Sequence, residues 1–307
     1  MNVFREARRQ LQGLPRKVRK NVKKVRDGIA VPIRLRKSLT RGGYLAVVAV
    51  FRDEGPYLKE WLEFHLKAGV DHFFLFDNGS VDNGREVLAA YPSKVTVRDW
   101  DGSQPGAYQR AVIDYGFGYR WMMFIDIDEF VFPSTVASLG EVLRGLESED
   151  LVLLPWRVFG TGGLDDRNRT SSVVRTFRRS INYRSENLPS RASKVKAIAN
   201  PGAIRRAGTH WPEMRRGSRP AVWSNGEART DKANMYGESQ QILLHHYVSK
   251  SRAEFEEKKS RNRRNRLLGN RYDPNSNDKV VALADSRESG AENISAVEFL
   301  DNESPWV

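Results

Sequence analysis

A long apolar run that contains two aspartates stands near the middle of the chain: Trp121-Met122-Met123-Phe124-Ile125-Asp126-Ile127-Asp128-Glu129-Phe130-Val131-Phe132-Pro133. Such a run predicts an interior strand, which we place at 121–125. Unpaired carboxylates are costly to bury, so Asp126 and Asp128 are expected at the strand's end, turned to the same side by strand alternation. Two such carboxylates suit Mg²⁺ or Mn²⁺ and leave room for substrate phosphates; the alternative is a turn with solvated acids.

Strands and helices alternate on either side of this run. Apolar segments predict further strands, and helical spacing of apolar residues predicts the helices between them. This alternation is typical of an α/β fold, with a Rossmann-like, mostly parallel sheet and helices on both faces. The expected strands are 44–51, 72–76, 95–97 and 121–125, and the expected helices begin at Pro56 and cover 82–91 and 105–119.

Acidic residues follow three of these strands. Asp53 follows the first, Asp77 the second, and Asp126 with Asp128 the last. The carboxyl ends of parallel strands meet at one edge of the sheet, which is where ligands bind in such folds. We therefore expect these acids to share one rim.

The pattern changes after about residue 150. Strands are expected at 151–155, 173–177, 195–198 and 242–247, followed by a charged helix at 252–268. The tail from Asp273 is rich in Asn, Asp, Ser and Glu, and we expect it to be irregular. The predicted organisation is a basic arm (1–41), a catalytic domain (42–270, with halves at about 42–150 and 151–270, the second mixed in topology), and a polar tail (271–307).

The 307-residue chain contains no cysteine, which excludes disulfides, a thiol nucleophile and a cysteine-type zinc site. It has no apolar run long enough for a membrane-spanning helix, and we expect no secretory signal. The net charge is +13, of which residues 1–41 carry +12 through fourteen basic and two acidic residues. Such an arm suits an anionic membrane surface, although it would equally suit a solvated extension. We expect a cytoplasmic protein that attaches peripherally to the inner face of a membrane, and no nucleic-acid binding.

Several blocks resemble known glycosyltransferases. The stretch Asp77-Asn78-Gly79-Ser80-Val81-Asp82 is similar to a signature of family 2-type glycosyltransferases of the GT-A fold. The segments around 57–73 and 121–132 resemble glycosyltransferase family 92, as do two later blocks. Those later blocks are Trp156-Arg157-Val158-Phe159-Gly160 and Leu244-His245-His246-Tyr247-Val248-Ser249-Lys250-Ser251. The resemblance covers about 44–265.

The resemblance implies that a sugar is transferred from a nucleotide donor with a divalent metal, Mn²⁺ or Mg²⁺, and with inversion at the anomeric carbon. It implies a UDP-linked donor and a glycan or lipid-linked acceptor. Asp128 would be the direct metal ligand, with Asp126 beside it and His245 or His246 as a third ligand, since only one of two neighbours on a strand can point inward. The implied donor-binding residues at the rim are Asp53, Glu54, Asp77, Asn78 and Asp82, with Asp126 facing the ribose or phosphate side of the donor.

Transfer also needs cations for the leaving diphosphate and a carboxylate base for the acceptor hydroxyl. Lys194 and Lys196 are candidate cations, in competition with Lys250 and Arg252, and the alternative for each is a solvated charge at a sheet edge. Candidate bases are Asp165 and Asp166 in a glycine-rich loop, and Glu213. Candidate acceptor contacts, each of which would also fit simple packing, are Trp156, His210 and Trp211.

Two other classes of protein would explain the paired acids. A nucleotidyltransferase acting on sugar phosphates uses them with a metal, but it places a glycine-rich, basic loop after the first strand. Here that position reads Arg52-Asp53-Glu54-Gly55-Pro56, which is acidic and poor in glycine. A non-catalytic carbohydrate-binding or membrane-surface protein is the second alternative, and the intact Asp126 and Asp128 pair argues against it.

Overall fold

A computed structural model describes residues 42–135, 138–183, 194–229, 240–267, 277–286 and 290–302. The basic arm lies outside these ranges, so the predictions for it stay predictions. Within the described ranges no helix combines the length and the apolarity needed to cross a membrane.

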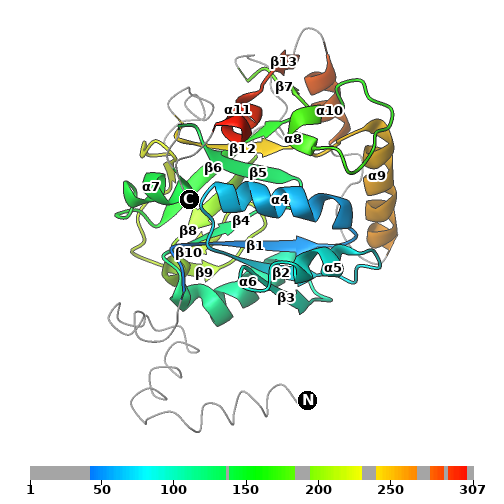
Figure 1. The fold of residues 1–307 in the computed structure, drawn as a ribbon. Coiled ribbons are helices and arrows are strands. Elements are labelled where there is room, and N and C mark those ends of the chain that lie inside the picture. Colours follow the sequence, from blue (N-terminus) through cyan, green and yellow to red (C-terminus); the bar gives the residue numbers. More distant parts are fainter. Residues whose placement is uncertain are drawn as a thin grey trace. The chain divides into compact units, whose positions relative to one another are not determined.

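The centre of the fold is a nine-stranded sheet (Figure 1). Its strands β3, β2, β1 and β4 pair in parallel, whereas β8 runs antiparallel to both of its neighbours. Further along, β6 and β12 are parallel, β5 is antiparallel to β12, and β11 pairs with β6. In sheet order the strands are β3 (Val95–Asp99), β2 (His72–Asp77), β1 (Leu45–Phe51), β4 (Trp121–Phe124), β8 (Val195–Ala199), β6 (Leu151–Val158), β12 (Ile242–His246) and β5 (Glu129–Pro133), with β11 (Val222–Trp223) beside β6.

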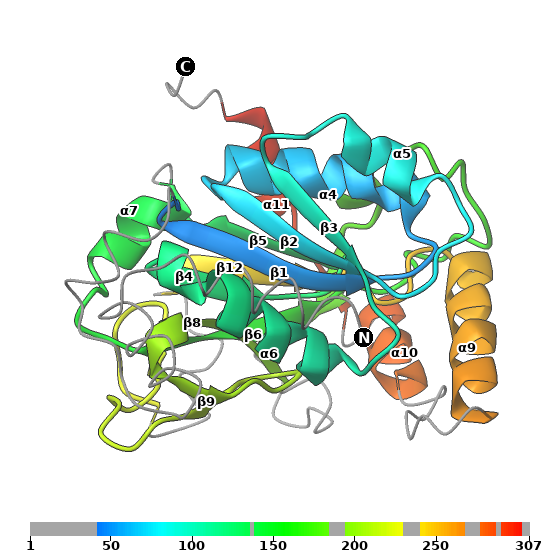
Figure 2. The same ribbon diagram turned by 90° about the horizontal axis from the view of Figure 1, so that it is seen from below.

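Helices cover both faces of the sheet, as Figure 2 shows for α4 (Gly55–Lys67) and α6 (Gln104–Tyr115). One apolar core contains Trp61 of α4, and a second core contains Tyr108 of α6. The expected α/β fold with a mostly parallel sheet and a mixed second half is therefore confirmed.

Local sequence explains where the two helices begin. Pro56 stands in the first turn of α4, where a missing backbone N–H costs nothing. The Ser103 hydroxyl accepts the backbone N–H of Gly106 and so caps α6. The side chains of β1, which precedes α4, are almost all buried, whereas β3, which precedes α6, is only partly buried.

The three acid-bearing strand ends do share one rim. β2, β1 and β4 are adjacent and parallel, with Phe51 opposite Asp77 in the register. Asp53 follows β1 and Asp126 follows β4, so both come after the same ends of neighbouring strands. In both views α9 (Arg252–Leu267) stands beyond this edge (Figures 1 and 2).

Two of the expected strands were wrong in detail. The run from Trp121 to Pro133 forms two strands, β4 and β5, and residues 125–128 connect them, so strand alternation does not orient Asp126 and Asp128. The segment expected as a strand at 173–177 is the short helix α8 (Val173–Thr176). It is capped by Ser172 and by Glu60, whose carboxylate accepts the N–H groups of Val173 and Val174.

The tail is not irregular over its described part. It forms α10 (Asp278–Asp285), β13 (Gly290–Glu292) and α11 (Ser295–Asp301). The few apolar residues of α10, Val280, Val281 and Ala284, are buried, and β13 pairs with β7 (Arg179–Ile181). The remaining elements are α5 (Gly84–Ala89), η1 (Gly116–Gly118), α7 (Leu139–Arg144), η2 (Pro201–Ala203), β9 (Ile204–Arg206) and β10 (Glu213–Met214).

Candidate active site

Asp126 lies directly after β4 and is held from several sides. Its Oδ2 accepts the ammonium of Lys196 on β8 at 2.8 Å, and its Oδ1 accepts the side-chain amide of Gln104 and the Tyr108 hydroxyl, both on α6. Its carboxylate is about a third exposed, which leaves a side open to a ligand. Gln104 and Tyr108 are a helical turn apart on α6, so one face of that helix orients this acid.

Lys196 and Glu129 form a buried support beneath Asp126. Both side chains are fully buried, and the Lys196 ammonium lies 3.4 Å from Glu129 Oε2. The same Glu129 oxygen accepts the backbone N–H of Asp126 at 2.8 Å. Burial raises the pKa of Glu129 well above its usual range, against the opposing charge of Lys196. Lys196, which the sequence suggested as a donor-binding cation, is therefore enclosed by two carboxyl groups of the protein.

Asp128 is a buried acid with two nitrogen partners. Oδ2 of Asp128 pairs with the ammonium of Lys258 on α9 and lies 3.5 Å from Nε2 of His246 on β12. The backbone carbonyl of Asp128 accepts the N–H of Tyr247, which fixes the acid beside β12. Although burial opposes ionisation, Lys258 and His246 hold the pKa of Asp128 well below its usual range.

The structure separates the two neighbouring histidines. His246 faces Asp128, whereas His245 packs against Phe132 and Phe159 with its ring nitrogens near Tyr247 and Ser295. This is the outcome of strand alternation, which turns adjacent side chains to opposite faces. His245 is therefore not brought to the acids. Burial lowers the pKa of His246, so its imidazole is neutral, the form that binds metals.

The side-chain types at this site fit Mn²⁺ or Mg²⁺. Asp126 and Asp128 offer oxygens and His246 offers an imidazole nitrogen, the ligand set that Mn²⁺ accepts. Among the described residues, buried Nδ1 of His246 and Nε1 of Trp156 lack a hydrogen-bond partner, which is uncommon for buried polar atoms. Within the same described part of the chain, no three His, Asp or Glu side chains are already arranged around a metal position. Lys258 instead occupies one oxygen of Asp128.

The rim residues implied for donor binding are closely interlocked. Both oxygens of buried Asp77 are used, one by the Ser80 N–H at 2.8 Å and the other by Arg85 at 2.5 Å. Asp82 accepts the N–H groups of Gly55 and Gly84 with its two oxygens. These two carboxylates thus hold the loops after β1 and β2 together, and donor contact through either would require these bonds to break.

Asp53 and Asn78 also take part in this loop. Asp53 has a left-handed backbone (φ 52°), and its Oδ1 accepts the Val81 N–H at 2.8 Å. The amide of Asn78 donates to the carbonyl of Trp100 at 2.9 Å. Glu54 directly precedes α4, and its charge acts on both Tyr57 and Lys250. Glu54 is therefore close to both Tyr57 and Lys250.

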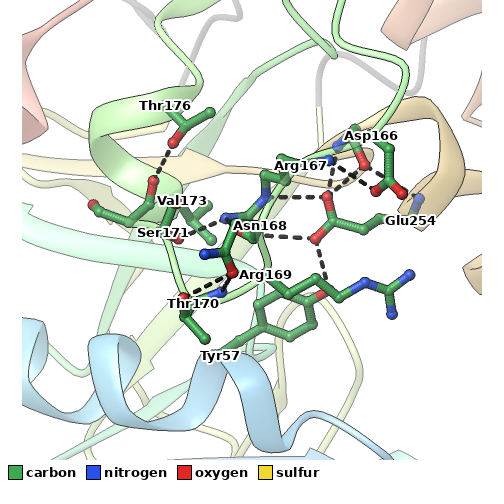
Figure 3. A network of polar contacts seen from close by, with 12 residues as sticks. Tyr57, Asp166, Arg167, Asn168, Arg169, Thr170, Ser171, Val173, Thr176 and Glu254 are labelled. Atoms are coloured by element: carbon green, nitrogen blue, oxygen red, sulfur yellow. Dashed lines mark hydrogen bonds and ion pairs between the residues drawn. The ribbon is translucent and has the colours of Figure 1, made fainter.

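A buried polar network anchors the segment that leads into α9 (Figure 3). Glu254, in the first turn of α9, accepts the Tyr57 hydroxyl at 2.7 Å, the Arg167 guanidinium at 3.1 Å and the Ser251 hydroxyl at 2.6 Å. The buried Lys250 ammonium lies 4.0 Å from the centre of the Tyr57 ring, and its backbone is left-handed (φ 53°). The network fixes α9 to α4 and to the loop that carries Arg167.

The three candidate bases lie in different surroundings. Asp165 is 86% exposed and pairs with Arg252 at the start of α9. Asp166, the next residue, accepts the Arg167 N–H and is also exposed (Figure 3). Glu213 on β10 pairs with both Arg205 and Arg206 of β9. The structure therefore brings Asp165 and Asp166 beside α9 and leaves Glu213 in a separate two-stranded sheet.

Aromatic residues pack against His246, the histidine beside Asp128. Trp156 packs against His246 with ring centres 4.2 Å apart, and His210 packs edge-on against Trp156. Burial and the charge of Lys196, with a smaller contribution from Lys194, lower the pKa of His210 to about 4. Trp156 is 7% exposed and Trp211 is 42% exposed, so of these two indoles only Trp211 presents a broad surface to solvent.

Sequence reasoning missed several contributors to the site. Gln104 and Tyr108 orient Asp126, and Lys258 pairs with Asp128, although all three are distant in sequence from the acids. No sequence pattern distinguished these three residues from the other polar residues of their helices. Glu129 was visible as the third acid of the central run, but its burial depended on the short strand β5.

Comparisons with known proteins identify the family of this chain. The family model of glycosyltransferase family 92 matches residues 49–280. A glycosyltransferase family 92 protein from Oryza sativa subsp. japonica is 34% identical over 106 residues, 33% of this chain and 18% of that protein. A galactan beta-1,4-galactosyltransferase from Arabidopsis thaliana is 30% identical over 104 residues, 29% of this chain and 20% of that protein. The chain thus matches only about a fifth of these relatives' length.

Among solved structures, glucosyl-3-phosphoglycerate synthase from Mycobacterium tuberculosis in complex with Mn²⁺, UDP and glucosyl-3-phosphoglycerate is similar. The match has 17% identity and a TM-score of 0.27, and covers 43% of this chain and 50% of that chain. A second mycobacterial protein matches 71% of this chain and 69% of its own, at 12% identity and a TM-score of 0.34. These scores are too low to compare the sites. Because the family model spans most of the chain, from the first strand of the sheet to α10, this protein belongs to glycosyltransferase family 92.

Proposed function

We propose that this chain transfers a sugar from a nucleoside-diphosphate donor to an acceptor hydroxyl, with a divalent metal and with inversion at the anomeric carbon. The observation that carries the proposal is the meeting of Asp126, Asp128 and His246 at the rim of a parallel sheet in a family 92 chain. Ligands of open α/β sheets bind at this edge. A UDP-linked donor is the expected one.

Asp128 and His246 would hold the metal, with Asp126 completing the acidic side. When bound, Mn²⁺ or Mg²⁺ supplies Lewis-acid stabilisation of the charge that develops on the leaving diphosphate. The remaining contributions come from this chain's side chains. The Lys196–Glu129 support and the α6 face keep Asp126 oriented, so little reorganisation is needed when the donor arrives.

Two further lysines lie close to Asp128. Lys258 contacts its carboxylate directly, and Lys250 is close enough for the charge of Asp128 to act on it. Cations at this point would stabilise the diphosphate as the glycosidic bond breaks. We assign the leaving-group role to this pair rather than to Lys194 or Lys196, because Lys196 is enclosed by protein carboxylates.

A carboxylate must accept the proton of the acceptor hydroxyl as that oxygen attacks. Asp165 and Asp166 are favoured over Glu213, because two arginines neutralise Glu213. An exposed acid beside α9 has the freedom to meet an acceptor. Trp211 would stack on an acceptor sugar, with the Arg229 guanidinium 4.1 Å from its ring centre.

The acceptor is proposed to be a glycan or a lipid-linked sugar. The basic arm suits an anionic membrane surface, and a lipid-linked acceptor would make a cytoplasmic, peripheral location useful. No contact in the described residues bears on this choice.

The function is tested by incubating the full chain with UDP- and GDP-sugars and Mn²⁺ while measuring nucleotide release. Release of a nucleoside diphosphate that Asp128→Ala abolishes is the expected result. Release of pyrophosphate from a nucleoside triphosphate and a sugar phosphate would instead identify a nucleotidyltransferase. Absence of turnover and of nucleotide binding across the panel would overturn the proposal and leave a binding protein.

A further inference from the structure

Two lysines pair with the two acids of the site, and they differ in how firmly they are held. Lys196 has no exposed surface and lies between Asp126 and Glu129, so its ammonium is fixed. The side chain of Lys258 is 26% exposed, and its ammonium contacts the carboxylate of Asp128 and the carbonyl of Val248, the latter at 3.3 Å. The first lysine is part of the core, whereas the second has a path to solvent.

Lys258 reaches Asp128 because α9 is anchored at its first turn. Glu254 and Lys258 are four residues apart, so they lie on the same face of the helix. Glu254 is bonded to Tyr57 and Arg167 (Figure 3). The N–H groups of Arg252 and Ala253 donate to the carbonyls of Leu164 and Asp165. The anchored helix therefore fixes the position of the Lys258 backbone relative to Asp128. Only the flexible Lys258 side chain must move for its ammonium to leave the carboxylate.

The Lys258 ammonium contacts the carboxylate that would also hold the metal. It occupies Oδ2 of Asp128, the oxygen that also faces His246. A divalent ion carries twice the charge of an ammonium and interacts more strongly with the same carboxylate. Without a metal, Lys258 supplies the counter-charge that the buried Asp128 needs, because an unpaired buried charge is costly.

We propose that Lys258 is an exchangeable counter-ion of the metal site. It neutralises Asp128 while no metal is bound, yields the carboxylate to the incoming divalent ion, and then turns to the diphosphate of the donor. This rests on the proposed function for the diphosphate step, but the competition for Asp128 concerns the metal alone. Lys258 is thus a positioning and charge-compensating residue whose partner changes as the donor enters.

The proposal makes opposite predictions for two ligands. In Lys258→Met the competitor for Asp128 is gone, so Mn²⁺ alone should bind on the order of tenfold more tightly, about 1.4 kcal/mol. UDP in the presence of saturating Mn²⁺ should bind more weakly, because the diphosphate loses a cation. A lysine with a merely structural role would weaken both, since its loss would loosen the site.

Calorimetry on the full chain measures both affinities. Lys259→Met is the matched control, because the neighbouring ammonium pairs with Glu256 and Asp278 instead, and it should change neither affinity. Lys258→Arg keeps a cation beside Asp128 and should not raise Mn²⁺ affinity. Circular dichroism and thermal melting show whether each variant is folded.

Unchanged or weaker Mn²⁺ binding by folded Lys258→Met would overturn the inference, even if the wild-type chain turns over a nucleotide sugar. The inference would also fail if neither the wild type nor the variant binds Mn²⁺. Tighter Mn²⁺ binding by Lys258→Met in a chain that releases no nucleotide from any donor would uphold the exchange at Asp128 while removing the proposed function.

Discussion

Replacing Glu254 by Gln should remove most of the stabilisation that the buried network around α9 provides. The side chain is 3% exposed and accepts bonds from Tyr57, Ser251 and Arg167, whose guanidinium is 5% exposed. Burial opposes the ionised form, yet these bonds hold the pKa of Glu254 at about 2, against an ordinary value of 4.5. The difference corresponds to about 3 kcal/mol of stability at neutral pH. The same loss, considered from the cation, leaves Arg167 buried without its counter-charge.

The stabilisation should depend on pH in a definite direction. The folded-state pKa is lowered, so the contribution is fully present above about pH 4.5 and is lost as the pH falls toward 2. Urea unfolding at pH 7 should therefore separate the wild type and Glu254→Gln by about 3 kcal/mol, and at pH 3 by roughly half of that. Glu256→Gln is the control; its side chain is 59% exposed, so its loss should cost less than about 1 kcal/mol.

A difference below about 1 kcal/mol at pH 7 would refute the idea that this network anchors α9. An equal difference at pH 7 and pH 3 would refute the electrostatic origin of the effect, and would point to packing alone. Adding Arg167→Met to Glu254→Gln should cost less than the sum of the two single changes, because the two residues stabilise through one shared pair.

Three further outcomes are expected. Asp128→Ala should lower sugar transfer at least about 100-fold with the fold retained by circular dichroism, since the acid lies in a turn rather than in the apolar core; full activity at saturating donor would remove it from the mechanism. Trp211→Ala should raise the acceptor KM while leaving the donor KM unchanged, and an equal change in both would exclude an acceptor platform. A chain that starts at residue 42 should keep its activity but lose flotation with anionic liposomes, and equal flotation of both chains would exclude the arm as a membrane anchor.

The position of the acids at the sheet rim could be predicted from the sequence because it depends on local patterns. Apolar runs of strand length, each followed by an acid and a helix, predict parallel strands that end at one edge. Asp53, Asp77 and Asp126 lie there as expected. The sequence also predicted that only one of His245 and His246 could face the acids, because adjacent strand residues face opposite ways.

The partners of those acids depended on tertiary structure. Lys258 and Asp128 are 130 residues apart, and Lys196 meets Asp126 only because β8 pairs with β4. The sequence showed Asp77 and Asp82 as candidate ligands, but not that both oxygens of each bond neighbouring groups of the protein.

The sequence by itself determined the type of sheet, the rim and the residue types at the site, since these follow from short-range hydrophobic periodicity and strand polarity. Only the tertiary structure decided which oxygen meets which cation, that residues 121–133 turn back as two strands, and that a polar tail contributes α10 to the core. The reason is that long-range pairing and burial select among many locally equivalent charges, and no local pattern distinguishes Lys258 from the other lysines and arginines of its helix.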